Sequence, residues 1–251
     1  MNTRALTAIS AAELRLFLRN TAVAVSALLM PLVIGGMFVV NGLQDTPESG
    51  WGFFVALMLL TVFGMSGCIA AAGTLSYRRD ELYLKRLRCS QASDTTILAG
   101  VLAPVVLVTI VQCVLMLLMV GAAAGSAPDN LVLVVVAIVL GTVCSVGLGM
   151  ATTGFSSSGE QAQTVATPVF FVLIGTAIWA ALDLAEGLTM LQMLTPGGAV
   201  VQLMHLAYAG SPSGTTTGAL SDALPAIGGL ALWAAVGVGA AKRYFRWEPR
   251  H

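Results

Sequence analysis

The sequence predicts an all-α membrane protein with six transmembrane helices. Of its 251 residues, 57% are hydrophobic and 10% are charged, and the mean hydropathy is +0.88. In a soluble domain about a quarter of the residues carry a charge. The charged residues leave uncharged windows that can each supply the roughly 20 apolar residues needed to cross a hydrocarbon core of about 30 Å. Six such windows cover residues 20–44, 49–77, 95–128, 130–159, 161–182 and 223–241.

The basic residues predict the orientation of these spans, because Lys and Arg are retained on the cytoplasmic side. With the N-terminus inside, six spans place all twelve bases on that side. The opposite loops carry only acids, namely Asp45, Glu48, Asp129, Asp183, Glu186 and Asp222. We therefore expect a multi-pass protein of the cell membrane with both termini in the cytoplasm. The zero net charge hides this polarity and does not indicate nucleic-acid binding.

Residues 3–19 are predicted to form a helix that lies along the inner membrane surface. At helical spacing Arg4, Arg15 and Arg19 share a narrow arc, and apolar side chains gather on the far side. Glu13 falls among the apolar residues. We expect it to pair with a base elsewhere in the cytoplasmic layer; the alternative is a frayed amphipathic start with no partner.

The first two spans are expected at about 21–42 and 51–76. The first contains Pro31, where we expect a kink that neighbouring groups can satisfy. The second is rich in small residues such as Gly64 and Gly67, which let helices approach closely in lipid.

The third span, about 95–125, is expected to start at a cap formed by Ser93 or Asp94. Its lone mid-span amide, Gln112, either hydrogen-bonds a neighbouring helix or lines a substrate path. A Gly-x-x-x-Gly pattern at Gly121–Gly125 is typical of close helix packing.

The fourth and fifth spans are expected at about 130–153 and 162–182. The fourth carries Gly141, Ser145 and Gly149 at four-residue spacing, which predicts another closely packed face.

Before the last span, the uncharged stretch 187–221 is too rich in Gly and Pro to cross the membrane. Thr195-Pro196 matches a helix start, with Thr at the cap and Pro at the first helical position. We expect a short re-entrant or outer helix here, followed by a sixth span at about 222–241.

Residues 77–94 form an island of charge that contains five of the twelve bases. Glu81 precedes Lys85 by four residues, the order that supports a helix. We interpret the stretch as a short surface helix; the alternative is a solvated loop that only orients the protein.

This loop resembles the cytoplasmic loop of ABC-2 type transporter permeases. The resemblance rests on Glu81, Leu84, Leu87, Arg88, Asp94, Leu98 and Gly100, with support from Arg19-Asn20 and Pro31, and it extends loosely over most of the chain. In that family the loop is a coupling helix that docks on the ATPase. The resemblance also implies an elbow helix at the N-terminus and short outer helices before the last span, where Leu194-Thr195-Pro196 matches the family's Leu-x-Pro.

The resemblance implies docking residues and a translocation path. The expected docking residues are Glu81, Leu84, Lys85, Arg86, Leu87 and Arg88. Leu84 and Leu87 are expected to fill an apolar groove on the ATPase, and Arg78 to contribute only to orientation. The candidates for the translocation path are Gln112, Pro196 and Gln202.

Other chemistry is not indicated. The two histidines, His205 and His251, belong to no cluster with metal-ligand spacing, so we expect no metal site. Neither Lys85 nor Lys242 follows a glycine, so the chain has no P-loop, and ATP and Mg²⁺ are expected in a partner subunit. The six spans hold no acid or base, which argues against a proton- or ion-driven transporter.

The leading hypothesis is a single domain, 1–251, that forms the permease subunit of an ATP-driven ABC exporter. It would move a drug-like, lipid-like or other amphipathic substrate out of the cytoplasm and would not itself be an enzyme. Its expected partners are an ABC ATP-binding subunit, a second permease subunit, identical or not, and membrane lipids. The alternatives are a membrane scaffold or assembly protein with a basic docking loop, and a secondary transporter.

Overall fold

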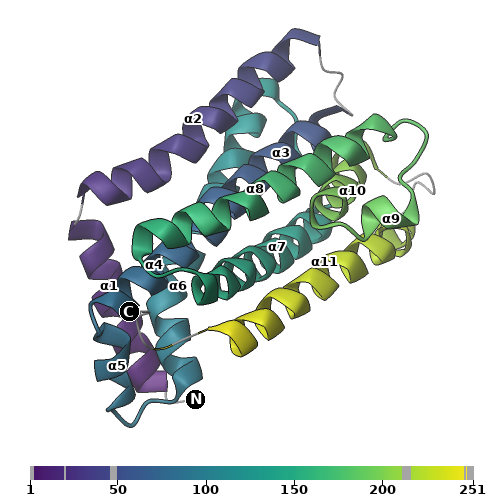
Figure 1. The fold of residues 1–251 in the computed structure, drawn as a ribbon. Coiled ribbons are helices and arrows are strands. Elements are labelled where there is room, and N and C mark those ends of the chain that lie inside the picture. Colours follow the sequence, from purple (N-terminus) through teal and green to yellow (C-terminus); the bar gives the residue numbers. More distant parts are fainter. Residues whose placement is uncertain (1–2, 20, 46–49, 211–215, 246, 248–251) are drawn as a thin grey trace.

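The computed structural model describes residues 3–19, 21–45, 50–210, 216–245 and 247. Within these residues every regular element is a helix, which confirms the predicted all-α fold (Figure 1). Their bounds are α1 Thr3–Arg19, α2 Thr21–Asp45, α3 Trp51–Val62, η2 Phe63–Ile69, α4 Ala70–Asp80, α5 Tyr83–Arg88, α6 Asp94–Ala124, α7 Leu131–Thr152, η3 Thr153–Phe155, α8 Gly159–Leu182, α9 Met190–Met193, α10 Pro196–Ala209 and α11 Thr216–Tyr244.

Six of these helical stretches correspond to the expected spans. In the described residues, five are long and apolar enough to cross a membrane: 51–80, 94–124, 131–155, 159–182 and 218–244. A shorter apolar segment, Leu28–Leu43, lies within α2, which continues through Pro31. The chain thus has the architecture of an all-α membrane protein with about six spans.

The second span is longer and less regular than expected. It runs without a break from Trp51 to Asp80 through α3, η2 and α4, and its middle part, η2, is a π-helix. π-helical segments are rare, and those that occur often lie at functional sites. The expected span ended at residue 76, so the last helical turn of α4 carries the first charged residues of the 77–94 stretch.

Small residues bring α7 close to the second span, as predicted. A side chain on Gly149 would meet the backbone oxygen of Cys68, and one on Gly141 would meet the ring of Phe63. The Gly121–Gly125 pattern behaves differently: among the described residues it packs on no other helix of this chain, and packing against a second subunit stays a prediction. Gly125 ends α6 with a φ of +66°, and the nearest described atom to a Cβ on Gly121 is the Ser126 oxygen at 3.8 Å.

The short outer helices are present. The Thr195 hydroxyl accepts a hydrogen bond from the Gly198 amide, Pro196 follows at the first helical position, and α10 is buried against α3, α8 and α11. The last helix begins at Thr216, earlier than the expected residue 222.

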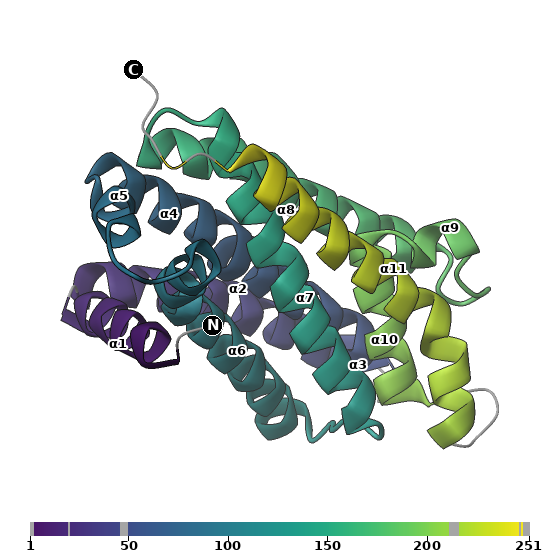
Figure 2. The ribbon, with the colours of Figure 1, turned by 90° about the horizontal axis from the view of Figure 1, so that it is seen from below.

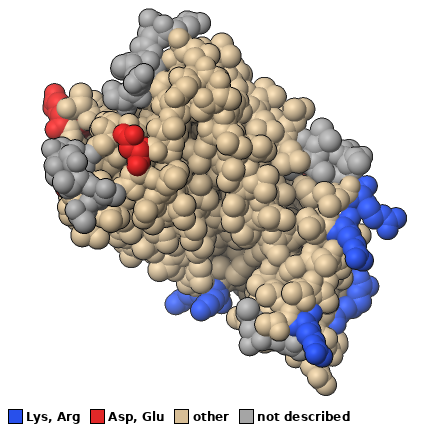
Figure 3. Space-filling model, turned by 180° about the vertical axis from the view of Figure 1, so that it is seen from behind, with Lys and Arg blue, Asp and Glu red and all other residues tan. Residues whose placement is uncertain are grey.

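Two pairings position the parts of the chain discussed below. α11 lies alongside α7, and α1 lies alongside α6, where Ile9 packs on Gly100 near the start of α6 (Figure 2). In the view of Figure 3 the Lys and Arg side chains gather at one end of the molecule and the Asp and Glu side chains at the other. We call the first of these the basic end; it is formed by α1, the end of α4, α5 and the start of α6 (Figure 1).

Candidate functional site

The predicted surface helix of residues 77–94 is present at the basic end, but it is short. α4 ends at Asp80, and α5 runs only from Tyr83 to Arg88. Leu82, between them, has a φ of 56°, a left-handed conformation that is unusual for a residue with a side chain and that interrupts the helix. Glu81 and Lys85 therefore do not lie on one helix, and the prediction that they do is wrong. The Glu81 carboxylate instead accepts a hydrogen bond from Arg78 Nη1 at 3.0 Å.

Leu84 is fully buried inside the chain rather than presented to a partner. It packs in a cluster with Leu75, Ile97 and Val101, from α4 and α6, and the partly buried Leu87 packs against the same cluster. The expectation that Leu84 fills a groove on the ATPase is therefore corrected. A helix of six residues can be held in place only if its apolar side is covered, and here the chain itself covers it.

The charged docking candidates face outward. Lys85 and Arg86 are exposed, and Arg86 Nη2 donates to the Glu81 carbonyl at 3.3 Å. Arg88 is 47% exposed; its Nε lies 3.1 Å from Asp94 Oδ1, and its guanidinium carbon lies 4.7 Å from the centre of the Trp247 ring. The surface available to a partner is thus mainly the basic face of α5.

Glu13 pairs with a base elsewhere at the basic end, Arg78, as predicted. Arg78 Nη2 and Nε both donate to Glu13 Oε2, at 2.7 and 3.2 Å, and the Glu13 side chain is only 4% exposed. Burial and the nearby Glu13 carboxylate raise the pKa of the Tyr83 phenol. The expectation that Arg78 contributes only to orientation is wrong, because Arg78 neutralises a buried carboxylate and joins α1 to α4.

The next two residues of α4 bind the turn between α7 and α8. Arg79, 1% exposed, donates from Nη1 to the Thr153 carbonyl at 2.9 Å and from Nη2 to the Ser156 carbonyl at 3.0 Å. Asp80 Oδ2 accepts from the Gly159 amide at 3.1 Å, at the start of α8. Hydrogen bonds of this kind, to charged groups, are the stronger ones in proteins. Sequence reasoning missed this connection, because nothing in the turn 154–161 identifies it as the partner of an arginine.

The three translocation candidates lie apart from the basic end. Gln112 is buried on α6, and its Nε2 donates to the Leu28 carbonyl of α2 at 3.3 Å, so the helix-to-helix alternative is confirmed. Pro196 is buried at the start of α10, and Gln202 is half-buried on the same helix. Figure 1 places α10 at the end of the molecule opposite α5. In the described parts of the chain, no three His, Cys, Asp or Glu side chains are grouped as metal ligands.

The sequence was compared with known proteins. A family model described as "ABC-2 family transporter protein" matches residues 5–241, nearly the whole chain. No curated protein matches the sequence. The family's membrane subunits partner with an ATP-binding subunit. The chain therefore belongs to the ABC-2 transporter family, as the multi-pass membrane subunit of an ABC transporter.

Proposed function

We propose that this chain is the permease of an ATP-driven exporter and that α5 passes the movement of the ATP-binding subunit to the membrane helices. The observation that carries the proposal is the triplet at the end of α4. Arg78 binds α1, Arg79 binds the turn after α7, and Asp80 binds the first residue of α8.

The triplet connects α5 to helices that α5 does not join directly in the chain. Residues 81–82 connect α5 to α4, and residues 89–93 connect it to α6. Because Leu84 is buried between these helices, α5 cannot shift without moving them. Through Arg78, Arg79 and Asp80 the same displacement reaches α1, η3 and α8. A movement of one short helix is thereby coupled to most of the bundle.

The proposed contact with the ATP-binding subunit is electrostatic at its edge and apolar in its middle. Lys85 and Arg86 would meet acids of the partner, and the exposed part of Leu87 would meet an apolar patch. Charges at the rim of an interface mainly set association rate and specificity. Leu84 is assigned a positioning role, since it holds α5 in place.

The proposed orientation puts the basic end in the cytoplasm, following the retention of Lys and Arg on that side. The substrate is proposed to be amphipathic, drug-like or lipid-like, and to move outward. ATP and Mg²⁺ would be bound by the partner, because the chain contains no P-loop.

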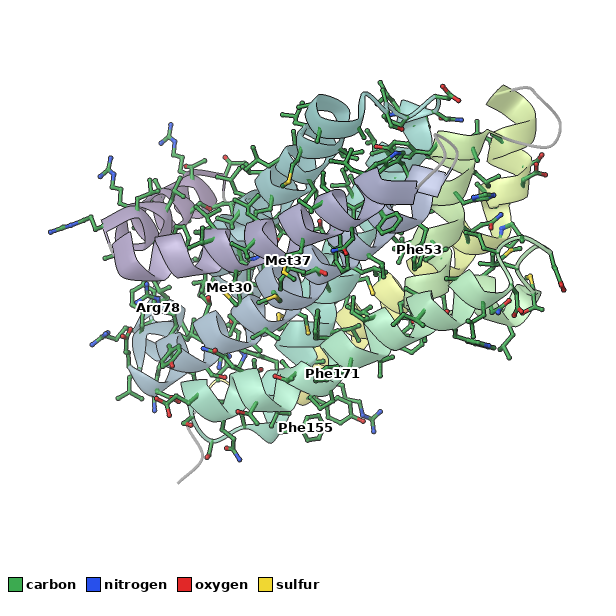
Figure 4. All side chains as sticks on the ribbon, turned by 90° about the horizontal axis from the view of Figure 1, so that it is seen from above. Met30, Met37, Phe53, Arg78, Phe155 and Phe171 are labelled. Atoms are coloured by element: carbon green, nitrogen blue, oxygen red, sulfur yellow. The ribbon has the colours of Figure 1, made fainter. Side chains whose placement is uncertain are left out.

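A second permease subunit is proposed to cover α8. This helix leaves large apolar side chains uncovered, including Phe171 at 65% and Leu182 at 77% exposure (Figure 4). Cysteine substitution at Phe171 should give a disulfide-linked dimer in membranes if two copies meet there. Cysteine at Val132, 54% exposed on α7, is the matched control and should stay monomeric.

The coupling proposal is tested by charge reversal on α5. The permease is purified with the ATP-binding subunit that accompanies it, and ATPase activity and export are measured in proteoliposomes. The double variant K85E/R86E should insert normally but bind the ATP-binding subunit weakly and lose export. The matched control, K242E/R243E, reverses two exposed bases at the end of α11 and should keep both activities.

Two results would overturn the proposal. If K85E/R86E bound the ATP-binding subunit and exported as well as the unmodified protein, α5 would not be the docking element. If no ATPase accompanied the chain in any preparation, the scaffold alternative would replace the exporter.

A further inference from the structure

A groove of about 610 Å³ opens beside the Glu13–Arg78 pair. Its walls come from α1, α2, the second span and α6. Much of the surface is apolar: Met30 and Pro31 contribute from α2, and Val105 and Val108 from α6. Figure 4 shows Met30 on α2 and Arg78 on α4 along this side of the bundle. The volume lies within the roughly 300–1,000 Å³ typical of small-molecule sites.

The polar end of the groove has one buried oxygen without a hydrogen bond. Both Arg78 bonds to Glu13 go to Oε2, and the third Arg78 nitrogen binds Glu81. In the described part of the chain, no donor meets hydrogen-bond geometry at Glu13 Oε1, although the Tyr83 hydroxyl interacts with the same carboxylate, and burial and this interaction raise the pKa of the phenol. Buried carboxylate oxygens are nearly always paired, because an unsatisfied one is costly.

The charged groups at this end are few. Two carboxylates, Glu13 and Glu81, share the single guanidinium of Arg78. Among the described residues that line the groove, Arg78 is the only base. Glu81 is 58% exposed and does not line the groove, so the groove itself holds one carboxylate and one guanidinium. What it lacks is a strong hydrogen-bond donor to Glu13 Oε1, and an ammonium head supplies one.

A second unsatisfied group lies further along the same wall. Ser66 sits in the π-helix η2, lines the groove, and its buried Oγ has no partner among the described residues. The buried hydroxyls of Thr61 and Thr109 behave differently, since each donates to a carbonyl one turn earlier in its own helix. Ser66 thus presents a hydroxyl without a partner to the wall of the groove.

We propose that the groove binds a single-chain amphiphile with a primary ammonium head. The ammonium group donates to Glu13 Oε1, which can only accept, and the tail lies along Met30, Pro31 and Val108. A neutral head would donate a weaker hydrogen bond to the carboxylate than an ammonium does. A phosphate head would require a base, and Arg78 is already shared by two carboxylates. The site deepens the proposed function by naming a substrate class, but binding itself does not depend on export.

Binding is tested on the full-length permease alone, in lipid nanodiscs without the ATP-binding subunit or ATP. The probe is a dodecylamine with a photoreactive diazirine near the end of its chain, and mass spectrometry locates the labelled peptides. Labelling should saturate, fall on the groove-lining parts of α2 and α6, and be competed by dodecylamine but not by dodecanol or dodecyl sulfate. Because no ATPase is present, failure of coupling and failure of binding are separate results.

Two independent variants test the geometry. Glu13→Gln keeps an acceptor for Arg78 but replaces Oε1 with an amide donor, and it should weaken labelling at least about tenfold. Its control, Glu160→Gln, neutralises an acid outside this groove and should change nothing. Val108→Phe fills the groove and should also abolish labelling. Leu107→Phe, at the neighbouring exposed position outside the groove, should not.

If Glu13→Gln proves unstable, the Val108 and Leu107 pair still decides the question. Unchanged labelling in Val108→Phe would overturn the proposal. Equal competition by an ethanolamine phospholipid would overturn the choice of ligand and make the groove a lipid site.

Discussion

Removing Arg78 should destabilise the protein more than any other single charge removal on α4 or α5. In Arg78→Ala the Glu13 carboxylate, only 4% exposed in the unmodified protein, loses both of its Arg78 hydrogen bonds. Breaking a buried ion pair from one side costs about 3–5 kcal/mol. Arg78 itself is 22% exposed, and some water can take its place, so we expect the lower part of that range, about 3 kcal/mol.

The informative comparison is the double variant. In Glu13→Gln, Arg78 keeps Glu81 and partial access to water, so the loss should be smaller, about 1 kcal/mol. In Arg78→Ala with Glu13→Gln, neither charge of this pair remains. The double variant should therefore be more stable than Arg78→Ala by roughly 1–2 kcal/mol, even though it carries one more substitution.

The assay is reversible unfolding of the purified protein by SDS in mixed micelles, followed by tryptophan fluorescence. Lys85→Ala, an exposed base on α5, is the control and should change the free energy of unfolding by less than about 0.5 kcal/mol. If Arg78→Ala were as stable as Lys85→Ala, or if the double variant were the least stable of the set, the ion-pair argument would fail.

Three further predictions follow from the packing. Arg79→Gln should preserve association with the ATP-binding subunit but reduce export in proteoliposomes, because it removes the bonds to the turn after α7 without touching the face of α5. Gly149→Leu should give aggregated or degraded protein in gel filtration, because its side chain would meet the Cys68 backbone, whereas Gly121→Leu should elute normally; the reverse order would contradict the packing. Burial lowers the pKa of His205 in α10, so below pH 6.5 the unfolded chain binds more protons than the folded one, and stability should be complete above that pH and fall below it. Limited proteolysis should therefore be faster at pH 5.5 than at pH 7.5, and His205→Asn should lack this difference.

The sequence was sufficient to predict the spans and the pairing of Glu13, because lipid makes their constraints severe. An uncharged window of sufficient length has few alternatives to a membrane helix. An acid on the apolar side of α1 must find a base, and it finds Arg78. Each of these inferences needs only the sequence of one helix and the medium around it, not the identity of its neighbours.

The errors concern choices between neighbours. Leu84 and Leu87 form an apolar side that could face an ATPase or the chain's own helices, and the pattern is the same in both cases. Leu82, between α4 and α5, adopts a left-handed conformation that the sequence does not reveal, because such a turn is usually marked by Gly or Asn rather than Leu. The partners of Arg79 are backbone carbonyls, which every residue possesses, so no sequence signal distinguishes Thr153 and Ser156.

The π-helix η2 determines the direction in which the end of α4 points. A π segment holds one residue more per turn than an α-helix, and each residue of an α-helix turns the chain by about 100°. If the same seven residues, 63–69, were wound as a regular α-helix instead, everything after them would be rotated by roughly that angle. Arg78 would turn away from α1, and Arg79 from the turn after α7. The azimuth of the charged triplet, rather than the length of the span, is what this irregular turn preserves.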